Sequence, residues 1–178
     1  MASFAILLTK LHQNKINLLH WPDNQDCLGN EILKHNSENL GIVWQDNEIN
    51  SISNGSIANY DLTDCNDLIT PLSIILAISS GGSLSGIGHT KYKESNRISK
   101  TISLMEDFGL NASYDGEVMT IPGGQLPIKP TLPVSSHSDH RIFMTAVALM
   151  TKFGGEVIGN GLHKIADPMF LDRLGIVE

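Results

Sequence analysis

The sequence predicts an α/β domain built from three similar units around a pseudo-threefold axis. Glycines at 41, 109 and 175 recur at nearly equal spacing, and each follows a large apolar residue. The first two precede pairs of short β-rich runs with turn residues between them, which is typical of hairpins. Helices at about 68–80 and 139–152 are apolar on nearly every side, so we expect them to be buried in the middle.

Each unit is expected to contain a helix, a strand, a second helix and a hairpin. Helical spacing of apolar residues, and glycines suited to left-handed helix ends, set the limits. Gly81 and Gly82 are expected to end the helix 68–80. Extended runs at 56–62 and 126–134 would supply the strand before the second and third units. The other expected helices are 3–12, 27–38, 95–108 and 167–174, the strands are 16–20, 42–45, 48–52, 83–87, 110–114, 117–121 and 156–159, and the units are about 1–55, 56–123 and 124–178.

Composition narrows the possible functions. The chain has 178 residues, of which 41% are hydrophobic, as expected for one globular domain or a large piece of a bigger protein. A formal charge of −7 argues against a general nucleic-acid surface, so any anion site must be local. Cys27 and Cys65 lack Cys-x-x-Cys spacing, which predicts neither a zinc site nor a disulfide framework and favours a cytoplasmic location.

No targeting segment is expected from the sequence. No apolar run reaches the ~18 residues of a membrane span, and the first residues lack the pattern of a signal peptide. The start, Met1-Ala-Ser-Phe-Ala, leads straight into an apolar helical pattern. We therefore expect the chain to be a piece of a longer protein.

Charged residues are concentrated in the stretch His89-Thr-Lys-Tyr-Lys-Glu-Ser-Asn-Arg97. If Ser95 caps the helix that follows, Arg97 lies in its first turn, where backbone N–H groups and the helix dipole favour an anion. Lys93 lies just outside that turn, and Glu94 beside it can exchange a proton. The stretch predicts a phosphate or carboxylate site, and the alternative is a solvated charge run on the surface.

A second polar cluster, Ser-Asp-His-Arg at 138–141, opens the third predicted unit's buried helix, with its serine as the expected cap. Asp67 opens the equivalent helix of the second unit. Helices of repeated units start at equivalent places, so these starts should meet the charged stretch at one anion-attracting end. His137, Asp139 and His140 could instead ligate a metal, but a helix cap with a hydrogen-bonding histidine is favoured because their spacing is not diagnostic.

These polar residues also match a family pattern. Lys-Tyr-Lys-Glu-Ser-Asn-Arg at 91–97, Asp-His-Arg at 139–141 and Asn-Asp at 66–67 resemble the Arg-x-Lys-Glu-(Ser/Thr)-Asp-Arg, Asp-His-Arg and Pro-Asp signatures of 3-phosphoshikimate 1-carboxyvinyltransferase (EPSP synthase). The resemblance runs from Ala2 to near Glu178. It implies a two-domain enzyme with three βαβαββ units per domain, an inside-out α/β arrangement. This chain would be the domain of the C-terminal half, and the N-terminal domain would be its partner.

The resemblance further implies a reaction. The family moves the enolpyruvyl group of phosphoenolpyruvate onto the 5-hydroxyl of shikimate 3-phosphate through a tetrahedral intermediate, and releases phosphate; no cofactor or metal is expected. Asp67 and Glu94 would be the acid/base carboxylates. Arginines suit bidentate contacts to the donor's phosphate and carboxylate, and a lysine would bind the shikimate side. The implied substrate-binding residues are Asp67, His89, Lys93, Arg97, His140, Arg141 and Lys164.

Several positions depart from the family pattern. Asn96 stands where Asp is usual, which removes a negative charge between the cations. His89 stands where Asn is usual, so its shikimate contact is in doubt. The family's lysine near the C-terminus matches Lys164 only with a different spacing to Pro168, and Lys164 could instead be an exposed loop lysine.

Two other functions remain open at this point. The related transferase that acts on UDP-N-acetylglucosamine shares the fold and the donor, but its acceptor-side motifs differ from Lys-Glu-Ser-Asn-Arg. A non-catalytic domain that binds an anion or docks to a partner is the other, because half of the cleft would be absent. Neither nucleic acid nor a membrane is an expected partner.

Overall fold

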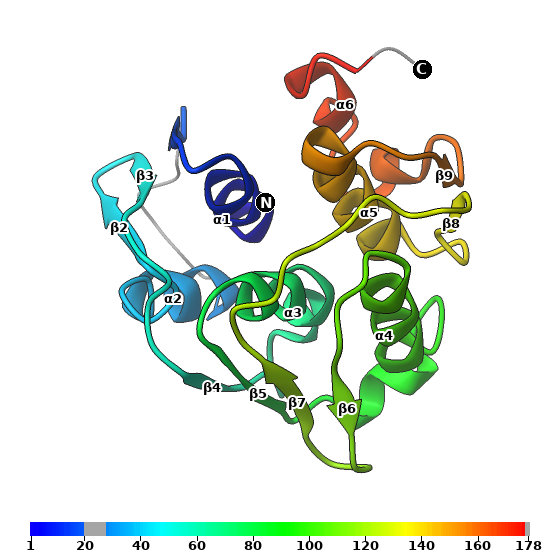
Figure 1. Cartoon of the computed structure of the whole chain (residues 1–178), viewed down its shortest axis with the longest axis horizontal. Coiled ribbons are helices and arrows are strands. Elements are labelled where there is room, and N and C mark those ends of the chain that lie inside the picture. Colours follow the sequence, from blue (N-terminus) through cyan, green and yellow to red (C-terminus); the bar gives the residue numbers. More distant parts are fainter. Residues whose placement is uncertain (20–27, 177–178) are drawn as a thin grey trace.

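The computed structural model describes residues 1–19 and 28–176 and alternates helices with short strands (Figure 1). The elements are α1 (Ala2–His12), β1 (Lys15–Asn17), α2 (Leu28–His35), β2 (Ile42–Gln45), β3 (Glu48–Ser51), β4 (Ala58–Asp61), η1 (Asn66–Leu68), α3 (Ile69–Ile78), β5 (Gly81–Ser85), η2 (Gly88–Tyr92), α4 (Arg97–Asp107), β6 (Ser113–Tyr114), β7 (Met119–Pro122), β8 (Val134–Ser135), α5 (His140–Phe153), β9 (Val157–Ile158), η3 (Leu162–Ile165) and α6 (Phe170–Arg173). The three η elements are short 3₁₀ turns. The predicted α/β class is confirmed.

The strands form three small sheets that repeat one plan. Their strand orders are β1-β3-β2, β4-β5-β7-β6 and β8-β9. In the second sheet β4 runs parallel to β5, and β5 runs antiparallel to the β7 strand of the hairpin. β1 meets the β2–β3 hairpin in the same antiparallel way, and β8 runs parallel to β9 as β4 does to β5. The two predicted hairpins are therefore confirmed.

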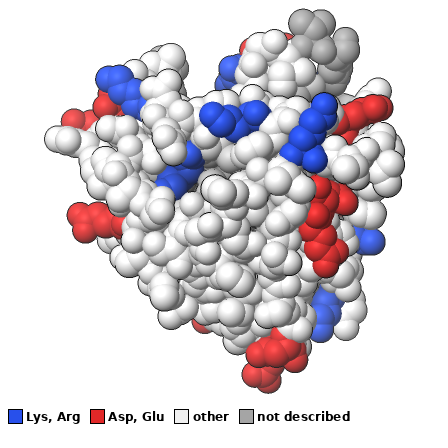
Figure 2. Space-filling view, viewed as in Figure 1, with Lys and Arg blue, Asp and Glu red and all other residues white. Residues whose placement is uncertain are grey.

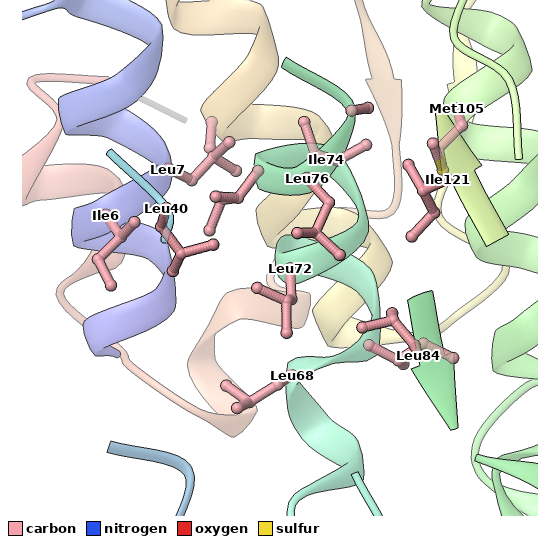
Figure 3. Close-up of a cluster of buried hydrophobic side chains, with 14 of the residues drawn as sticks. Ile6, Leu7, Leu40, Leu68, Leu72, Ile74, Leu76, Leu84, Met105 and Ile121 are labelled. Carbon is pink, nitrogen blue, oxygen red and sulfur yellow. The ribbon is translucent and has the colours of Figure 1, made fainter. Parts of the chain in front are cut away.

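The core lies where α1, α3 and α5 pack against one another, with α3 between the other elements. Every residue of α3 from Ile69 to Ala77 is buried. Figure 3 shows Leu72 and Leu76 of α3 between Leu7 of α1 on one side and Leu84 of β5 on the other. Burying each such side chain contributes about 1.5–3 kcal/mol, so burial holds this helix in the middle as predicted.

Glycines serve two different structural roles in the fold. Gly41, Gly109 and Gly175 have φ angles of 68, 71 and 68°, the left-handed conformation expected at helix ends. Gly82 lies in β5 opposite Ala58, and a Cβ on it would lie 1.8 Å from the Ala58 carbonyl oxygen. The prediction that Gly81-Gly82 ends the helix is wrong, because the helix ends at Ile78 and the glycines allow two strands to approach.

The expected caps Ser95 and Ser138 are each wrong by one residue. Asn96 caps α4, where its Oδ1 accepts a hydrogen bond from the Ser99 backbone N–H at 3.3 Å. Asp139 caps α5. Serine, asparagine and aspartate are all good capping residues, so the sequence pattern alone could not choose between neighbours. The departure at Asn96 thus keeps the capping role that an aspartate would have.

Surface charge is distributed in separate groups. On the face drawn in Figure 2, Lys and Arg lie mainly in the upper half, and Asp and Glu lie mainly toward the edges. No helix in the described ranges is long and apolar enough to cross a membrane. Of the two cysteines, Cys65 is buried and Cys27 lies outside the described residues.

Candidate active site

The starts of the buried helices meet at one end of the domain, as predicted. A hollow of about 380 Å³ lies there, with a wall formed by the starts of α1, α2 and α5 and by η1. The wall includes Asp67, Lys93 and Arg141. Helix starts carry positive partial charge, so this end of an acidic chain favours an anion.

Arg97 lies at the centre of the polar network beside the hollow and is only 1% exposed. Its Nε donates to Asp139 Oδ2 at 3.0 Å, and its Nη1 donates to Asp67 Oδ1 at 2.8 Å. Its Nη2 lies 3.4 Å from Asp139 Oδ1 and 3.5 Å from Glu94 Oε2. Burial disfavours the charged form, but the bonds to Asp139 and Asp67 outweigh it and raise the pKa of Arg97. One guanidinium therefore joins three carboxylates.

Asp139 ties the start of α5 to this guanidinium. It is fully buried, and its Oδ1 accepts the backbone N–H of Arg141 at 2.8 Å and that of Ile142 at 3.4 Å. Its Oδ2 accepts the hydroxyl of Ser95 at 3.0 Å as well as the Nε of Arg97. A buried carboxylate needs such partners because an isolated buried charge is costly. Asp139 therefore caps α5 and orients Arg97 at once.

Asp67 bridges the two arginines at the edge of the hollow. Its Oδ1 binds Arg97, and its Oδ2 accepts from Arg141 Nη2 at 2.9 Å. Partial burial opposes ionisation of Asp67, but the charge of Arg141 and the hydrogen bond from Arg97 outweigh it, so the pKa of Asp67 lies below its usual value. The Nε of Arg141 is buried and has no hydrogen-bond partner within the described ranges. This Nε lies below the surface, so a ligand reaches it only when the Arg141 side chain turns.

Glu94 and His140 form the next pair. The Nδ1 of His140 lies 2.8 Å from Glu94 Oε2, and His140 is buried while Glu94 is partly exposed. The histidine therefore fixes the carboxylate on the side facing Arg97. Because Asp67 and Glu94 both lie against one guanidinium, the two predicted acid/base carboxylates are neighbours in space.

The chain matches one family along nearly its whole length. The family model described as EPSP synthase (3-phosphoshikimate 1-carboxyvinyltransferase) matches residues 1–168. The chain belongs to the EPSP synthase family.

Curated EPSP synthases align with most of this chain. The 3-phosphoshikimate 1-carboxyvinyltransferase of Methanobrevibacter smithii is 28% identical over 160 residues, which are 89% of this chain and 36% of that protein. The protein of the same name from Korarchaeum cryptofilum is 34% identical over 128 residues, which are 67% of this chain and 29% of that protein. The chain therefore spans about a third of the length of these relatives.

A solved EPSP synthase has the same fold. The 2.37 Å structure from Acinetobacter baumannii superposes with a TM-score of 0.67 at 20% sequence identity and covers 99% of this chain and 45% of that one. At this identity the likeness supports the fold alone. The inside-out α/β fold implied by the family motifs is confirmed.

Three of the side chains could in principle hold a metal. Ligand atoms of Glu94, Asp139 and His140 lie within 4.8 Å of one another, whereas His137 is outside this group. The guanidinium of Arg97 already bonds to Asp139 and lies 3.5 Å from Glu94. A fixed cation therefore balances these carboxylates where an ion would have to bind, and the geometry favours an arginine-centred site.

The other three predicted substrate-binding residues lie at the surface. Lys93 is exposed and lines the hollow. His89 is exposed on η2 and is not in the wall of the hollow. Lys164 is exposed on η3, which packs near the start of α5 because His163 stacks on Phe143 with ring centroids 6.0 Å apart. The structure thus brings Lys93 to the hollow and leaves the roles of His89 and Lys164 as predictions.

Ser95 and Asp139 join the network although the sequence suggests them only as an expected cap and a possible metal ligand, not as catalytic or substrate-binding residues. The sequence provides little indication that Ser95 and Asp139 contact each other, because they are 44 residues apart and each also fits a helix start. The clue that could have found Asp139 is its position one residue before the helix that carries His140 and Arg141. An aspartate there accepts backbone N–H groups with one oxygen and leaves the other for a basic side chain.

Proposed function

We propose that residues 1–178 form the C-terminal-half domain of an enzyme that moves the enolpyruvyl group of phosphoenolpyruvate to the 5-hydroxyl of shikimate 3-phosphate and releases phosphate. The observation that carries the proposal is the shared contact of Asp67 with Arg97 and Arg141, with Glu94 on the same guanidinium. Membership of the EPSP synthase family supports the choice of reaction, since the matched relatives carry the name of this activity.

The reaction passes through its tetrahedral intermediate in two steps, addition and elimination, and each step requires two proton transfers. In the addition step, the 5-hydroxyl oxygen bonds to C2 of phosphoenolpyruvate and loses its proton to a base, and an acid delivers a proton to C3. In the elimination step, C3 gives its proton back to a carboxylate, the bond from C2 to the phosphate oxygen breaks with its electron pair on that oxygen, and the departing phosphate takes up the second proton. We assign these transfers to Asp67 and Glu94, because two carboxylates in different surroundings can hold different protonation states.

We assign the binding of the substrates' anionic groups to the basic residues. Arg97 and Arg141, whose Nε has no hydrogen-bond partner in the part of the chain that the structure describes, would bind the phosphate and carboxylate of the donor. Lys93, on the wall of the hollow, would bind the shikimate side. His140 would orient Glu94 through its 2.8 Å contact. His89 and Lys164 are kept as peripheral contacts to shikimate 3-phosphate and the donor, respectively.

The three sheets differ in their number of strands, and the matched relatives are longer than this chain. In the second sheet β5 has β4 on one side and the β7–β6 hairpin on the other. Among the described residues, no strand pairs with β1 in the place of β4, and no hairpin pairs with β9. We infer that an N-terminal domain forms the other wall of the cleft, because the chain spans 36% or less of the length of the matched relatives. The cytoplasmic location stays a prediction that rests on the cysteine content.

An activity assay tests the proposed function. A polypeptide that joins residues 1–178 to the N-terminal domain of an EPSP synthase should form product from shikimate 3-phosphate and phosphoenolpyruvate, and Glu94→Gln should lower turnover by about 10²–10⁴-fold. UDP-N-acetylglucosamine should not replace the acceptor. Turnover within about twofold of the parent for Glu94→Gln would remove its acid/base role.

A non-catalytic anion-binding domain is the second candidate. It is favoured by the share of the relatives' length that this chain covers, 36% or less. Holding both substrates between two walls supplies roughly 7–11 kcal/mol of barrier lowering, and one wall forfeits most of it. Residues 1–178 alone should therefore be silent in the assay, and measurable product from them alone would contradict the two-domain proposal.

A further inference from the structure

Asp67 occupies the position that an anionic substrate of the proposed reaction needs. One of its oxygens accepts from Arg97 Nη1 at 2.8 Å, and the other accepts from Arg141 Nη2 at 2.9 Å. A phosphate or carboxylate presents a similar pair of oxygens, and charge-assisted bonds to guanidinium groups are among the strongest that it can form. The protein's own carboxylate and the ligand therefore compete for the same donors.

Of the groups in this contact, Asp67 is the one that can move. Its side chain is 51% exposed and lies on the three-residue η1, whereas the side chain of Arg97 is 2% exposed. Asp139 bonds to Arg97 and also caps the helix that carries Arg141. When Asp67 turns away, Arg97 keeps a buried carboxylate partner, so no buried charge is left uncompensated.

We propose that an anionic ligand displaces Asp67 from Arg141, and that this release frees the Asp67 carboxylate for proton transfer. The inference rests on the proposed function, because that function assigns a proton-transfer role to Asp67. Before the ligand binds, both carboxylate oxygens accept hydrogen bonds, and the two arginines keep the pKa of Asp67 below its usual value. Asp67 is then a weak base. Once Arg141 turns to the ligand, one of the two charges that hold the carboxylate ionised is neutralised, and Asp67 becomes more basic.

The groups around Asp67 make this displacement necessary for strong binding. Cations and carboxylates are close to balance at the site, so an ionised Asp67 between the arginines repels an incoming anion. Turning it outward leaves the guanidinium of Arg141 to the ligand. Within the described ranges, the charged or titratable groups that contact Asp67, are linked to it through Arg97 or line the same hollow are Arg97, Arg141, Lys93, Asp64, Glu94, Asp139, His140, Cys65 and the amino group of Met1.

Titration with inorganic phosphate, followed by NMR, tests the competition. The chain offers a matched control, because Asp64 lines the same hollow, carries the same charge and is exposed. We expect Asp67→Asn to bind phosphate about fivefold to tenfold more tightly than the parent chain, because the competing charge is gone. Asp64→Asn should improve binding by less than about twofold, through screened long-range charge alone. In both cases the shifts should lie around residues 93–97 and 139–141.

A carbon-13 titration of the Asp67 carboxyl in the unmodified chain provides a second measurement that needs no variant. Its pKa should rise when the site is saturated with phosphate. An unchanged pKa, equal gains for the two variants, or weaker binding by Asp67→Asn would each overturn the displacement. Phosphate binding that Arg141→Ala does not weaken would overturn the arginine site and thus the proposed function as well. Binding that requires Arg141 but ignores Asp67 would overturn only the inference.

Discussion

Basic side chains lie at the starts of α4 and α5 and in the last turns of α1 and α5, but they are held in different ways. At the helix starts, Arg97 and Arg141 contact carboxylates around a hollow of about 380 Å³. At the opposite ends, Lys10 and Lys152 line a larger cavity of about 580 Å³, and Lys10 donates to the backbone carbonyl of Ser53 at 2.5 Å.

The difference lies in what the helices themselves contribute. The last turn of a helix carries partial negative charge, so lysines there are already matched by the backbone. The first turn carries partial positive charge, so arginines there add to a field of their own sign and only acidic side chains balance it. Arg141 even retains an Nε without a partner among the described residues. We therefore expect the smaller hollow to bind anions more strongly than the larger cavity does.

The largest expected effect is the loss of stability on replacing Arg97, the basic residue at the centre of the polar network. Arg97→Ala leaves the fully buried Asp139 without its charged partner, so the free energy of unfolding should fall by about 3–5 kcal/mol. Denaturant unfolding measures it, with Arg97→Lys as a control that keeps one charge but loses the forked contact. A loss below about 1 kcal/mol would mean that the buried Asp139 does not depend on Arg97 for charge compensation.

Arg141→Ala should show the opposite division between stability and binding. The side chain is 17% exposed and pairs with a half-exposed Asp67, so stability should fall by only about 0–1 kcal/mol. Phosphate affinity should fall by about 2 kcal/mol, or roughly 30-fold, because the displaced Nη2 of Arg141 is the expected donor to the ligand. Lys152→Ala at the opposite end is the matched control and should leave affinity unchanged. Equal losses at the two ends would erase the contrast between them.

How far the sequence predicts this molecule depends on the range of each interaction. Local signals worked well, because the spacing of apolar residues and the glycines at 41, 109 and 175 set the elements to within a few residues. The buried position of α3 also followed from its composition. The prediction that Gly81 and Gly82 end the helix was wrong because a glycine suits both a helix end and a close approach of two strands. The approach depends on Ala58, which is distant in the sequence.

The site divides in the same way. The sequence motifs identified Glu94, Arg97 and Arg141 as candidate site residues. The repeat predicted that they lie close together, because the helices of the repeated units start at equivalent places. The burial of Arg97 could not be predicted, since arginines are mostly exposed and the nearby Lys93 and Glu94 also favour a solvated surface. Its contacts with Asp67 and Asp139 span 30 and 42 residues of sequence, so they exist only once the repeat has folded.

A substitution at the helix ends should have a small effect and sharpen the contrast. Lys10→Met keeps the buried aliphatic stem and removes one bond to the Ser53 carbonyl, so the free energy of unfolding should change by about 1 kcal/mol or less. Burial lowers the pKa of Lys10, which means that charging this amine already costs stability and part of the lost bond is regained. Phosphate titration should give the parent affinity. A weaker affinity would show that the two ends are coupled.

The smallest expected effect is a pH dependence that belongs to the helix starts alone. The pKa of Asp67 is lowered in the folded chain, so the unfolded state binds its proton first as the pH falls. Its contribution to stability is therefore complete above the ordinary value of 3.8 and disappears as the pH drops through the lower folded value. Because the group is half exposed, we expect well under ~1 kcal/mol. Melting temperatures of the parent chain and Asp67→Asn should thus approach each other below pH 3.8, whereas the parent and Lys10→Met, which share every carboxylate, should stay parallel over the same range. If the Asp67→Asn difference were constant with pH, the bridge to Arg97 and Arg141 would not be holding an ionised carboxylate.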